Sequence, residues 1–257
     1  MQNESNAGTK AVLVTGGSRG LGRNMAISLA KAGFDVVITF HTNEGAAAEV
    51  ENEIRALGRR SAALRLDTGD IKSFAAFLTN LRNALQRVGH ETLFGLVNNA
   101  GIGLTAPFAE TTEEIFDQLL NVHFKGVFFL TQKVLPLLQD GGRVINISSG
   151  LARVSLPGFS AYGAAKGAIE VLSRYLAKEL SDRRIAVNVM APGGIETDFG
   201  GGAVRDNPDV NAFIASQTAL GRAGLPDDIG PVVAALFSDS HRWVNGQRIE
   251  VSGGWAI

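Results

Sequence analysis

The chain has 257 residues, 45% of them hydrophobic, which suits one large α/β domain or at most two small ones. Its 24 Lys and Arg residues nearly balance its 25 Asp and Glu residues, so charge gives no reason to expect nucleic acid or an anionic membrane as a partner. The absence of cysteine excludes disulfides, thiol catalysis and thiolate metal sites. The polar start lacks a signal-peptide pattern, and no apolar run reaches the roughly 18–20 residues that span a bilayer. We therefore expect a cytoplasmic protein.

Short apolar, β-branched runs alternate with helical patterns along the chain. The expected strands are Ala11–Thr15, Val36–Phe40, Ser61–Leu66, Leu93–Val97, Arg143–Ile147, Ile185–Met190 and Arg248–Val251. The expected helices are Leu21–Ala32, Ala46–Leu57, Ile71–Val88, Glu113–Leu138, Ala161–Leu180 and Pro226–Phe237. This alternation predicts an α/β fold with a doubly wound parallel sheet of about seven strands and helices on both faces.

One segment departs from the alternation. Residues 192–225 are rich in Gly and polar residues, include Gly200–Gly202, and suggest one short helix near Asp209–Ser216. Long loops in compact domains are often active-site lids. We therefore expect a single domain over residues 1–257, with a substrate lid around 192–225.

A glycine cluster follows the first expected strand. Gly16, Gly20 and Gly22 stand at G-x3-G-x-G spacing directly before a helical pattern. Such glycines let a pyrophosphate approach the backbone at a helix N-terminus, where the N–H groups and the helix dipole favour negative charge. A plain strand–helix turn is the alternative, but the position at the first strand–helix junction favours a dinucleotide site.

The end of the second expected strand indicates which nicotinamide cofactor binds. Enzymes that prefer NAD usually place a carboxylate there, whereas this chain has Phe40 followed by His41, Thr42 and Asn43. Arg19 in the glycine loop can supply the charge-assisted contact that a 2′-phosphate needs, and His41 and Thr42 can add hydrogen bonds. These residues favour NADP(H) over NAD(H), although Arg19 could also be a solvated loop cation.

A catalytic set is indicated between Ser149 and Lys166. Tyr162 and Lys166 are four residues apart on an expected helix, so both side chains lie on one face. An ammonium group favours the phenolate and lowers the pKa of a tyrosine from about 10, which makes the pair a plausible acid/base for a carbonyl oxygen. Ser149 follows the strand ending at Ile147, and the carboxyl ends of strands point into the ligand cleft. The neighbouring Ser148 is the alternative serine.

These motifs resemble those of the short-chain dehydrogenase/reductase family, over nearly the whole chain. The glycine motif has the family's T-G-x-x-x-G-x-G form, and Asn98–Gly101 matches its N-N-A-G motif. The resemblance implies a Rossmann-type domain in which Tyr162 protonates the carbonyl oxygen and Ser149 hydrogen-bonds that oxygen. It also implies that Lys166 lowers the tyrosine pKa and holds the nicotinamide ribose. Asn121 matches the helix asparagine that holds a water for proton relay.

The resemblance extends to the cofactor cleft. It implies that Asp67 lies beside the adenine, and that the backbone after Pro192, together with Thr197, holds the nicotinamide carboxamide and the phosphates. The residues expected to bind the cofactor are Gly16, Ser18, Arg19, Gly20, Leu21, Gly22, His41, Thr42, Asp67, Thr68, Asn99, Ala100, Gly101, Tyr162, Lys166, Pro192, Gly193, Ile195 and Thr197.

We therefore predict an NADP(H)-dependent oxidoreductase that reduces a ketone or other carbonyl, or oxidises the matching alcohol, by hydride transfer. One alternative is a non-catalytic NADP-binding regulator or redox sensor, which we would expect to lack Tyr162 or Lys166. Another is a nucleotide-sugar epimerase or dehydratase, which usually has a different glycine spacing and a longer C-terminal domain. The remaining histidines, His90, His123 and His241, lack metal-ligand spacing, so we expect no metal site and give them ordinary structural roles.

The expected pocket walls are Gly103–Phe108, Leu151–Phe159 and Gly194–Ala203. Within them Leu151, Val154, Leu156 and Phe159 make one wall apolar, with Arg153 as its lone charge, which indicates a partly hydrophobic small-molecule substrate.

Two partners follow from the resemblance. Similar 3-oxoacyl-acyl-carrier-protein reductases dock the carrier protein on basic residues before the fifth strand and after the catalytic helix. This chain has Asp140 in the first region but Arg183 and Arg184 in the second, so a 3-oxoacyl thioester substrate on a carrier protein is only half supported. The family also implies a homo-oligomer, a tetramer or dimer, built partly on the catalytic helix, where the small residues of 164–168 permit close packing.

Overall fold

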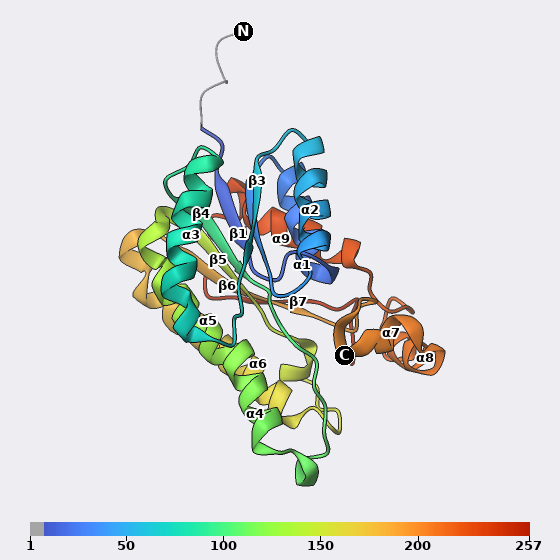
Figure 1. Cartoon of the computed structure of the whole chain (residues 1–257). Coiled ribbons are helices and arrows are strands. Elements are labelled where there is room, and N and C mark those ends of the chain that lie inside the picture. Colours follow the sequence, from blue (N-terminus) through green and yellow to red (C-terminus); the bar gives the residue numbers. More distant parts are fainter. Residues whose placement is uncertain (1–7) are drawn as a thin grey trace.

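The computed structural model describes residues 8–257, so residues 1–7 of the predicted domain lie outside it. Within the described residues, one parallel sheet has seven strands in the order β3-β2-β1-β4-β5-β6-β7 (Figure 1). The strands are β1 (Ala11–Val14), β2 (Asp35–Phe40), β3 (Ser61–Arg65), β4 (Leu93–Asn98), β5 (Leu138–Ile147), β6 (Ala186–Pro192) and β7 (Arg248–Val251). The predicted doubly wound sheet is confirmed, and every predicted strand is present.

Helices cover both faces of this sheet (Figure 1). One face packs against α1 (Gly20–Lys31), α2 (Glu44–Ala56) and α9 (Gly230–Leu236). The other face packs against α3 (Phe74–Arg87), α5 (Gly126–Val134) and α6 (Ser160–Glu179). Three further helices are α4 (Glu113–Leu120), α7 (Ala203–Asp206) and α8 (Pro208–Ser216).

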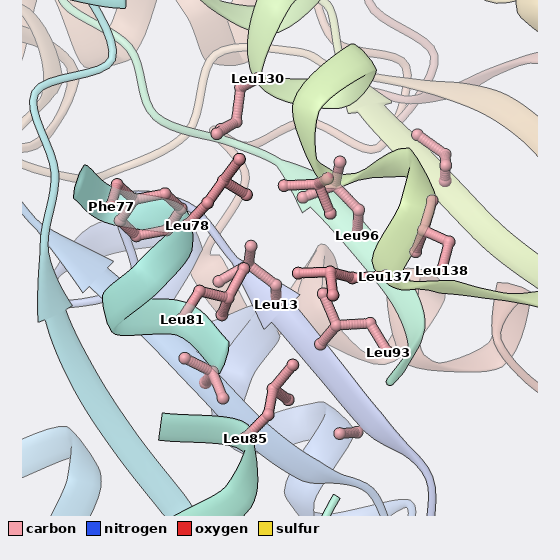
Figure 2. Close-up of a cluster of buried hydrophobic side chains, with 14 of the residues drawn as sticks. Leu13, Phe77, Leu78, Leu81, Leu85, Leu93, Leu96, Leu130, Leu137 and Leu138 are labelled. Atoms are coloured by element: carbon pink, nitrogen blue, oxygen red, sulfur yellow. The ribbon is translucent and has the colours of Figure 1, made fainter. Parts of the chain in front are cut away.

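The alternation of side chains along β1 divides the core into two layers. Leu13 points to the α3 side, where it packs with Leu81 and other fully buried leucines (Figure 2). Its neighbours Val12 and Val14 point to the α1 side, where Met25 is fully buried. Because both faces of the strand are covered, its sequence is a continuous apolar run. Truncating such a buried leucine to alanine costs about 2–5 kcal/mol of stability.

The single helix predicted over Glu113–Leu138 is interrupted. α4 is followed by a π-helical turn at Asn121–Lys125, then by α5 and a 3-10 turn at Leu135–Leu137. Leu138 already belongs to β5. Proline at position 136 lacks a backbone N–H and ends the α-helical ladder, which explains the 3-10 turn. π-helical turns inside α-helices frequently mark functional sites.

The segment after β6 is more helical than its composition suggests. The helix predicted near Asp209–Ser216 is α8, but α7 and a 3-10 turn at Phe199–Gly202 precede it. Gly200, Gly201 and Gly202 have φ of 59°, 73° and 78°, in the left-handed region that favours glycine. Isolated bridges join Ile195 to Gly224 and Thr218 to Trp255. Across residues 8–257, no helix combines the length and apolarity needed to cross a membrane.

Candidate active site

A cavity of about 1230 Å³ opens where the strand order reverses between β1 and β4. At this point the loops after neighbouring parallel strands diverge to opposite faces, which creates a crevice at the carboxyl ends of the strands. Every residue that the sequence predicted to bind the cofactor or to act in catalysis lines this cavity. The predicted residues therefore lie together, although they are spread from Gly16 to Thr197.

The glycine loop is packed so tightly that side chains are excluded from it. A Cβ added to Gly22 would lie 2.1 Å from the carbonyl oxygen of Gly16, and one added to Gly16 would lie 2.9 Å from Cα of Ala100. Gly16 and Gly20 also have positive φ, 64° and 54°. The start of α1 therefore meets the cavity with its backbone exposed, which is the arrangement that binds a pyrophosphate.

Asn99 holds this loop from the neighbouring strand. Its side-chain Nδ2 donates to the carbonyl oxygens of Thr15 (2.9 Å) and Gly16 (3.2 Å). In return, Thr15 Oγ1 accepts from the backbone N–H groups of Asn99 (2.9 Å) and Ala100 (3.0 Å). The Asn99 side chain thus positions the glycine loop while the residue lines the cavity.

The end of the cavity beside β2 has a cationic side chain, that of Arg19. Arg19 is exposed and, within residues 8–257, its guanidinium has no hydrogen bond or ion pair. His41 Nε2 lies 3.6 Å from the Oδ2 of Asp67, whose Oδ1 accepts from the Gly69 N–H. With no acidic residue from Phe40 to Asn43, this donor set fits a ribose that bears a 2′-phosphate.

Tyr162 and Lys166 lie at the opposite end, both buried at 7% and 5% exposure. Burial raises the pKa of Tyr162 to about 12, an effect that a hydrogen bond with the Ser149 side chain partly offsets. Burial lowers the pKa of Lys166 to about 7, and its Nζ donates to the carbonyl oxygen of Ile147 at 2.8 Å. Tyr162 therefore keeps its proton at neutral pH.

This geometry differs from one sequence-based expectation. We expected the ammonium of Lys166 to lower the pKa of Tyr162, but its Nζ lies 5.6 Å from the ring centroid and bonds to a carbonyl. Desolvation outweighs the attraction between the two groups at this separation. A protonated phenol is the form that can donate to a carbonyl oxygen.

The two adjacent serines have different surroundings. Ser148 is buried, and its Oγ donates to the Glu170 carboxylate (2.8 Å). Ser149 Oγ accepts from the Leu151 N–H at 3.1 Å and is the hydroxyl that acts on Tyr162. The structure thus brings Ser149, and not Ser148, to the tyrosine.

The π-helical turn contributes three residues to the cavity lining, Asn121, Val122 and His123. Within the described residues, the side chain of Asn121 has no hydrogen bond to protein. His123, for which we expected an ordinary structural role, is 1% exposed and stands edge-on to Tyr162, with ring centroids 5.1 Å apart. Sequence spacing carries no signal for this contact, because it depends on the packing of the π-helical turn against α6.

The substrate end is apolar, as expected, but its composition differs. Leu151, Leu156 and Phe159 line the cavity, whereas Arg153 and Val154 do not. Arg153 turns outward to the Glu250 carboxylate (2.7 and 2.9 Å), so the prediction that it is the lone charge of the wall was wrong. From the other two predicted walls, the residues absent from the lining are Leu104, Phe108, Glu196, Gly201 and Gly202. The lining also includes Val204, Val210, Phe213 and Ile214, which lie in the predicted lid segment but outside the predicted walls, and Trp255, which the sequence did not indicate.

Comparison with known proteins identifies the family. A family model described as enoyl-(acyl carrier protein) reductase matches residues 16–256. A tetrahydroxynaphthalene reductase of Pestalotiopsis fici is 35% identical over 256 residues, which cover 95% of this chain and 91% of the relative. Both relatives and predicted motifs therefore indicate an oxidoreductase that acts on carbonyl groups.

Solved structures of similar proteins lead to the same family. The angucycline C-6 ketoreductase LanV with bound NADP has a TM-score of 0.91 and 38% identity, covering 96% of this chain and 95% of that one. A short-chain dehydrogenase/reductase from Serratia marcescens has a TM-score of 0.89 and 30% identity, covering 96% and 98%. These likenesses confirm the predicted fold and agree with the predicted cofactor preference. The chain belongs to the short-chain dehydrogenase/reductase family.

Proposed function

We propose that this protein is an NADP(H)-dependent ketoreductase whose substrate is a planar, largely apolar ketone of aromatic or polycyclic character. The observation that carries the proposal is the aromatic surround of the catalytic tyrosine. The rings of Phe159 and Phe199 stand 6.4 and 5.9 Å from that of Tyr162, centroid to centroid. Phe213 and Ile214 extend the same apolar lining. Flat apolar rings pack well against such side chains.

The cofactor follows from the two ends of the cavity. The backbone of the glycine loop and the Arg19 guanidinium suit a dinucleotide with a 2′-phosphate, and Pro192, Gly193, Ile195 and Thr197 line the end near Tyr162. NADPH supplies the hydride when it is bound. Lys166, whose Nζ is buried beside the tyrosine, is in place to hold the nicotinamide ribose. The relatives' bound NADP supports this choice.

The chain's own residues then supply the proton. Tyr162, protonated at neutral pH, donates it from the phenolic oxygen to the substrate oxygen as negative charge develops there. The Ser149 hydroxyl donates a hydrogen bond to the same oxygen. Lys166, with a pKa of about 7, can return a proton toward the phenolate. The presence of all three groups in one cavity argues against a non-catalytic cofactor sensor.

We propose that the segment 192–225 is a lid that completes the apolar wall of the substrate end. A Cβ added to Gly103 would lie 2.9 Å from the Cα of Gly200, so the loop after β4 and the segment after β6 touch through two glycines. Phe199, Val204, Val210 and Phe213 all belong to this segment and line the cavity. Movement at Gly200–Gly202 would open the substrate end to solvent.

A carrier-protein substrate is less well supported. Docking would require Arg183 to contact an acidic carrier protein. Its Nε instead donates to Asp140 (2.8 Å) and its Nη1 to the carbonyl oxygen of Leu135 (2.9 Å). Asp140 thus neutralises Arg183, which leaves Arg184 as the exposed one of the two arginines expected to contact a carrier. A free aromatic ketone needs no such surface.

A homo-oligomer is supported by the outer face of α6. Ala164, Val171 and Tyr175 are exposed, and a Cβ added to Gly167 would meet open space. The spacing of these residues places them along one side of the helix. Exposed apolar side chains in such a row mark a protein contact, and we propose a second copy of this chain as the partner.

The test is cofactor consumption with NADPH and NADH in parallel, against three ketone classes: a bicyclic aryl ketone such as 1-tetralone, a small aliphatic ketone and a 3-oxoacyl thioester. We expect NADPH consumption that is fastest with the aryl ketone and lower by about 10³-fold or more in Tyr162→Phe, which keeps the ring but lacks the proton. Tyr175→Phe is the matched control. Preference for the thioester would overturn the substrate class, and near-normal turnover in Tyr162→Phe would overturn the mechanism.

A further inference from the structure

The π-helical turn between α4 and α5 directs one buried histidine at the catalytic tyrosine. The turn spans Asn121–Lys125, and within it His123 is buried while Lys125 is exposed. The loop after β4 leaves space for the imidazole, because a Cβ added to Gly101 would lie 2.7 Å from His123 Cε1. The wider turn and the glycine together make a slot that fits this ring.

Two contacts fix the imidazole in the slot. Its Nε2 lies 2.7 Å from the carbonyl oxygen of Ile102 and 3.2 Å from the backbone nitrogen of the same residue, and the shorter contact is the one in which a protonated Nε2 donates. Its edge meets the ring of Tyr162 at a centroid distance of 5.1 Å and an interplanar angle of 86°, the T-shaped geometry that aromatic pairs favour. His123 therefore ties the loop after β4 to the catalytic face of α6.

The surroundings keep this histidine uncharged. Burial, reinforced by the charge of Lys166, lowers the pKa of His123 to about 3. Tyr162 and Lys166 are the titratable groups of α6 that act on it or touch it. Its Nδ1 is buried and, within the described residues, has no hydrogen-bond partner. The ring therefore carries no charge at neutral pH, and its effect on the site comes through its position and volume.

We propose that His123 is a positioning residue of the active site, which orients the Tyr162 ring and keeps water away from the Tyr162–Lys166 pair. The proposal rests on the proposed role of Tyr162 as proton donor. The contact with Ile102 sets the position of the imidazole, and the edge contact between the two rings then sets the orientation of the Tyr162 phenol.

Exclusion of water has a measurable consequence. Burial is the leading cause of both the raised pKa of Tyr162 and the lowered pKa of Lys166. If a smaller side chain at position 123 admits water, the charged forms of both groups are solvated again. The pKa of Tyr162 then falls from about 12 toward its usual value near 10, and that of Lys166 rises.

Three substitutions separate the two parts of the proposed role. His123→Ala removes the tether and the volume. His123→Phe keeps a ring against Tyr162 but cannot donate to Ile102. His123→Asn keeps an amide donor for Ile102 and loses the ring edge. Lys125→Ala, in the same π-helical turn but exposed, is the matched control.

The chain has only two tyrosines, which permits a direct titration of one of them. In a Tyr175→Phe background, the ultraviolet absorbance of phenolate reports on Tyr162 alone, and circular dichroism defines the pH range in which each variant is folded. We expect phenolate to appear at lower pH in His123→Ala than in the parent, and His123→Phe to titrate like the parent. This readout does not depend on any substrate.

Turnover of the aryl ketone completes the test. We expect kcat to fall about tenfold or more in His123→Ala and less in His123→Phe and His123→Asn, while the Kd for NADPH changes by less than about twofold in each. Parent-like titration and parent-like kcat in folded His123→Ala would overturn the proposal. If the parent itself reduces no ketone, the proposed function fails, and the phenolate titration alone still decides the role of His123.

Discussion

Arg19→Ala should separate the two nicotinamide cofactors. Arg19 stands at the N-terminus of α1, lines the cavity and, among the described residues, has no carboxylate or carbonyl partner to replace. Removing it therefore breaks no internal contact. The substitution therefore weakens only the binding of an anion at this position. NADPH differs from NADH by its 2′-phosphate alone, so the affinity for NADPH should fall.

The size of the effect can be worked out from the site. A hydrogen bond between a guanidinium and a phosphate contributes about 1.5–3 kcal/mol, and the exposure of Arg19 places it in the lower part of that range. At 1.4 kcal/mol for each factor of ten, this corresponds to a rise of roughly 10–30-fold in the Kd for NADPH. The Kd for NADH should change by less than about twofold.

The assay is titration of each reduced cofactor, followed by its fluorescence, at two salt concentrations. Arg23→Ala is the matched control, because Arg23 lies on the same helix but already pairs with Glu53. Salt should weaken NADPH binding in the parent more than in Arg19→Ala, since screening acts on the lost charge pair. Equal losses of NADPH and NADH affinity would refute the assignment of Arg19 to the 2′-phosphate.

Two further predictions concern stability and assembly. Hydrogen bonds, first from Arg153 and then from Arg248 and Ser252, lower the pKa of Glu250 from 4.5 to about 2, so this stabilisation is present above pH 4.5 and is lost as pH falls toward 2. Thermal unfolding should therefore show a smaller loss of Tm over that window in Glu250→Gln than in the parent; identical acid dependence would contradict the assignment. Val171→Arg should reduce the mass measured by light scattering by half or more, whereas Leu57→Asp, at the end of α2 on the other face of the sheet, should not; unchanged mass in Val171→Arg would exclude the α6 contact.

Much of the fold could be predicted because its signals are local. Short, largely apolar or β-branched runs that alternate with helical patterns identified all seven strands, and the glycine spacing identified the junction at which the cofactor cleft opens. The i, i+4 spacing put Tyr162 and Lys166 on one helix face, and the place after β5 indicated a serine, Ser148 or Ser149, in the cleft. Resemblance to the family then assigned the roles and selected Ser149.

The features that the sequence missed depend on contacts between distant segments. A helical periodicity continues through Asn121–Lys125, so nothing local shows that the turn widens and aims His123 at Tyr162. Arg153 was placed in the substrate wall because its neighbours are apolar, but its partner Glu250 lies 97 residues away. The pKa of Tyr162 was expected to fall because Lys166 is near in sequence, whereas burial by the whole domain raises it.

The outward turn of Arg153 also explains how the end of the chain becomes part of the site. Besides Glu250, Arg153 donates to the carbonyl oxygens of Trp255 (2.8 Å) and Ala256 (3.2 Å). These bonds hold Trp255 against Gly150, where a Cβ would lie 2.7 Å from the indole, and Trp255 lines the cavity.

The same ion-pair network also contacts the elements that carry the catalytic residues, on the side away from the cavity. Arg248 joins Glu250 (2.6 Å) to Glu170 (2.7 Å), and Glu170 accepts from Ser148, the residue before the catalytic serine. A buried or half-buried charge whose partner is removed is costly, so each member of the network fixes the next. The loop bearing Ser149, the helix bearing Tyr162 and the C-terminal wall are therefore held as one unit, whereas the proposed lid, segment 192–225, contributes no ion pair to this network.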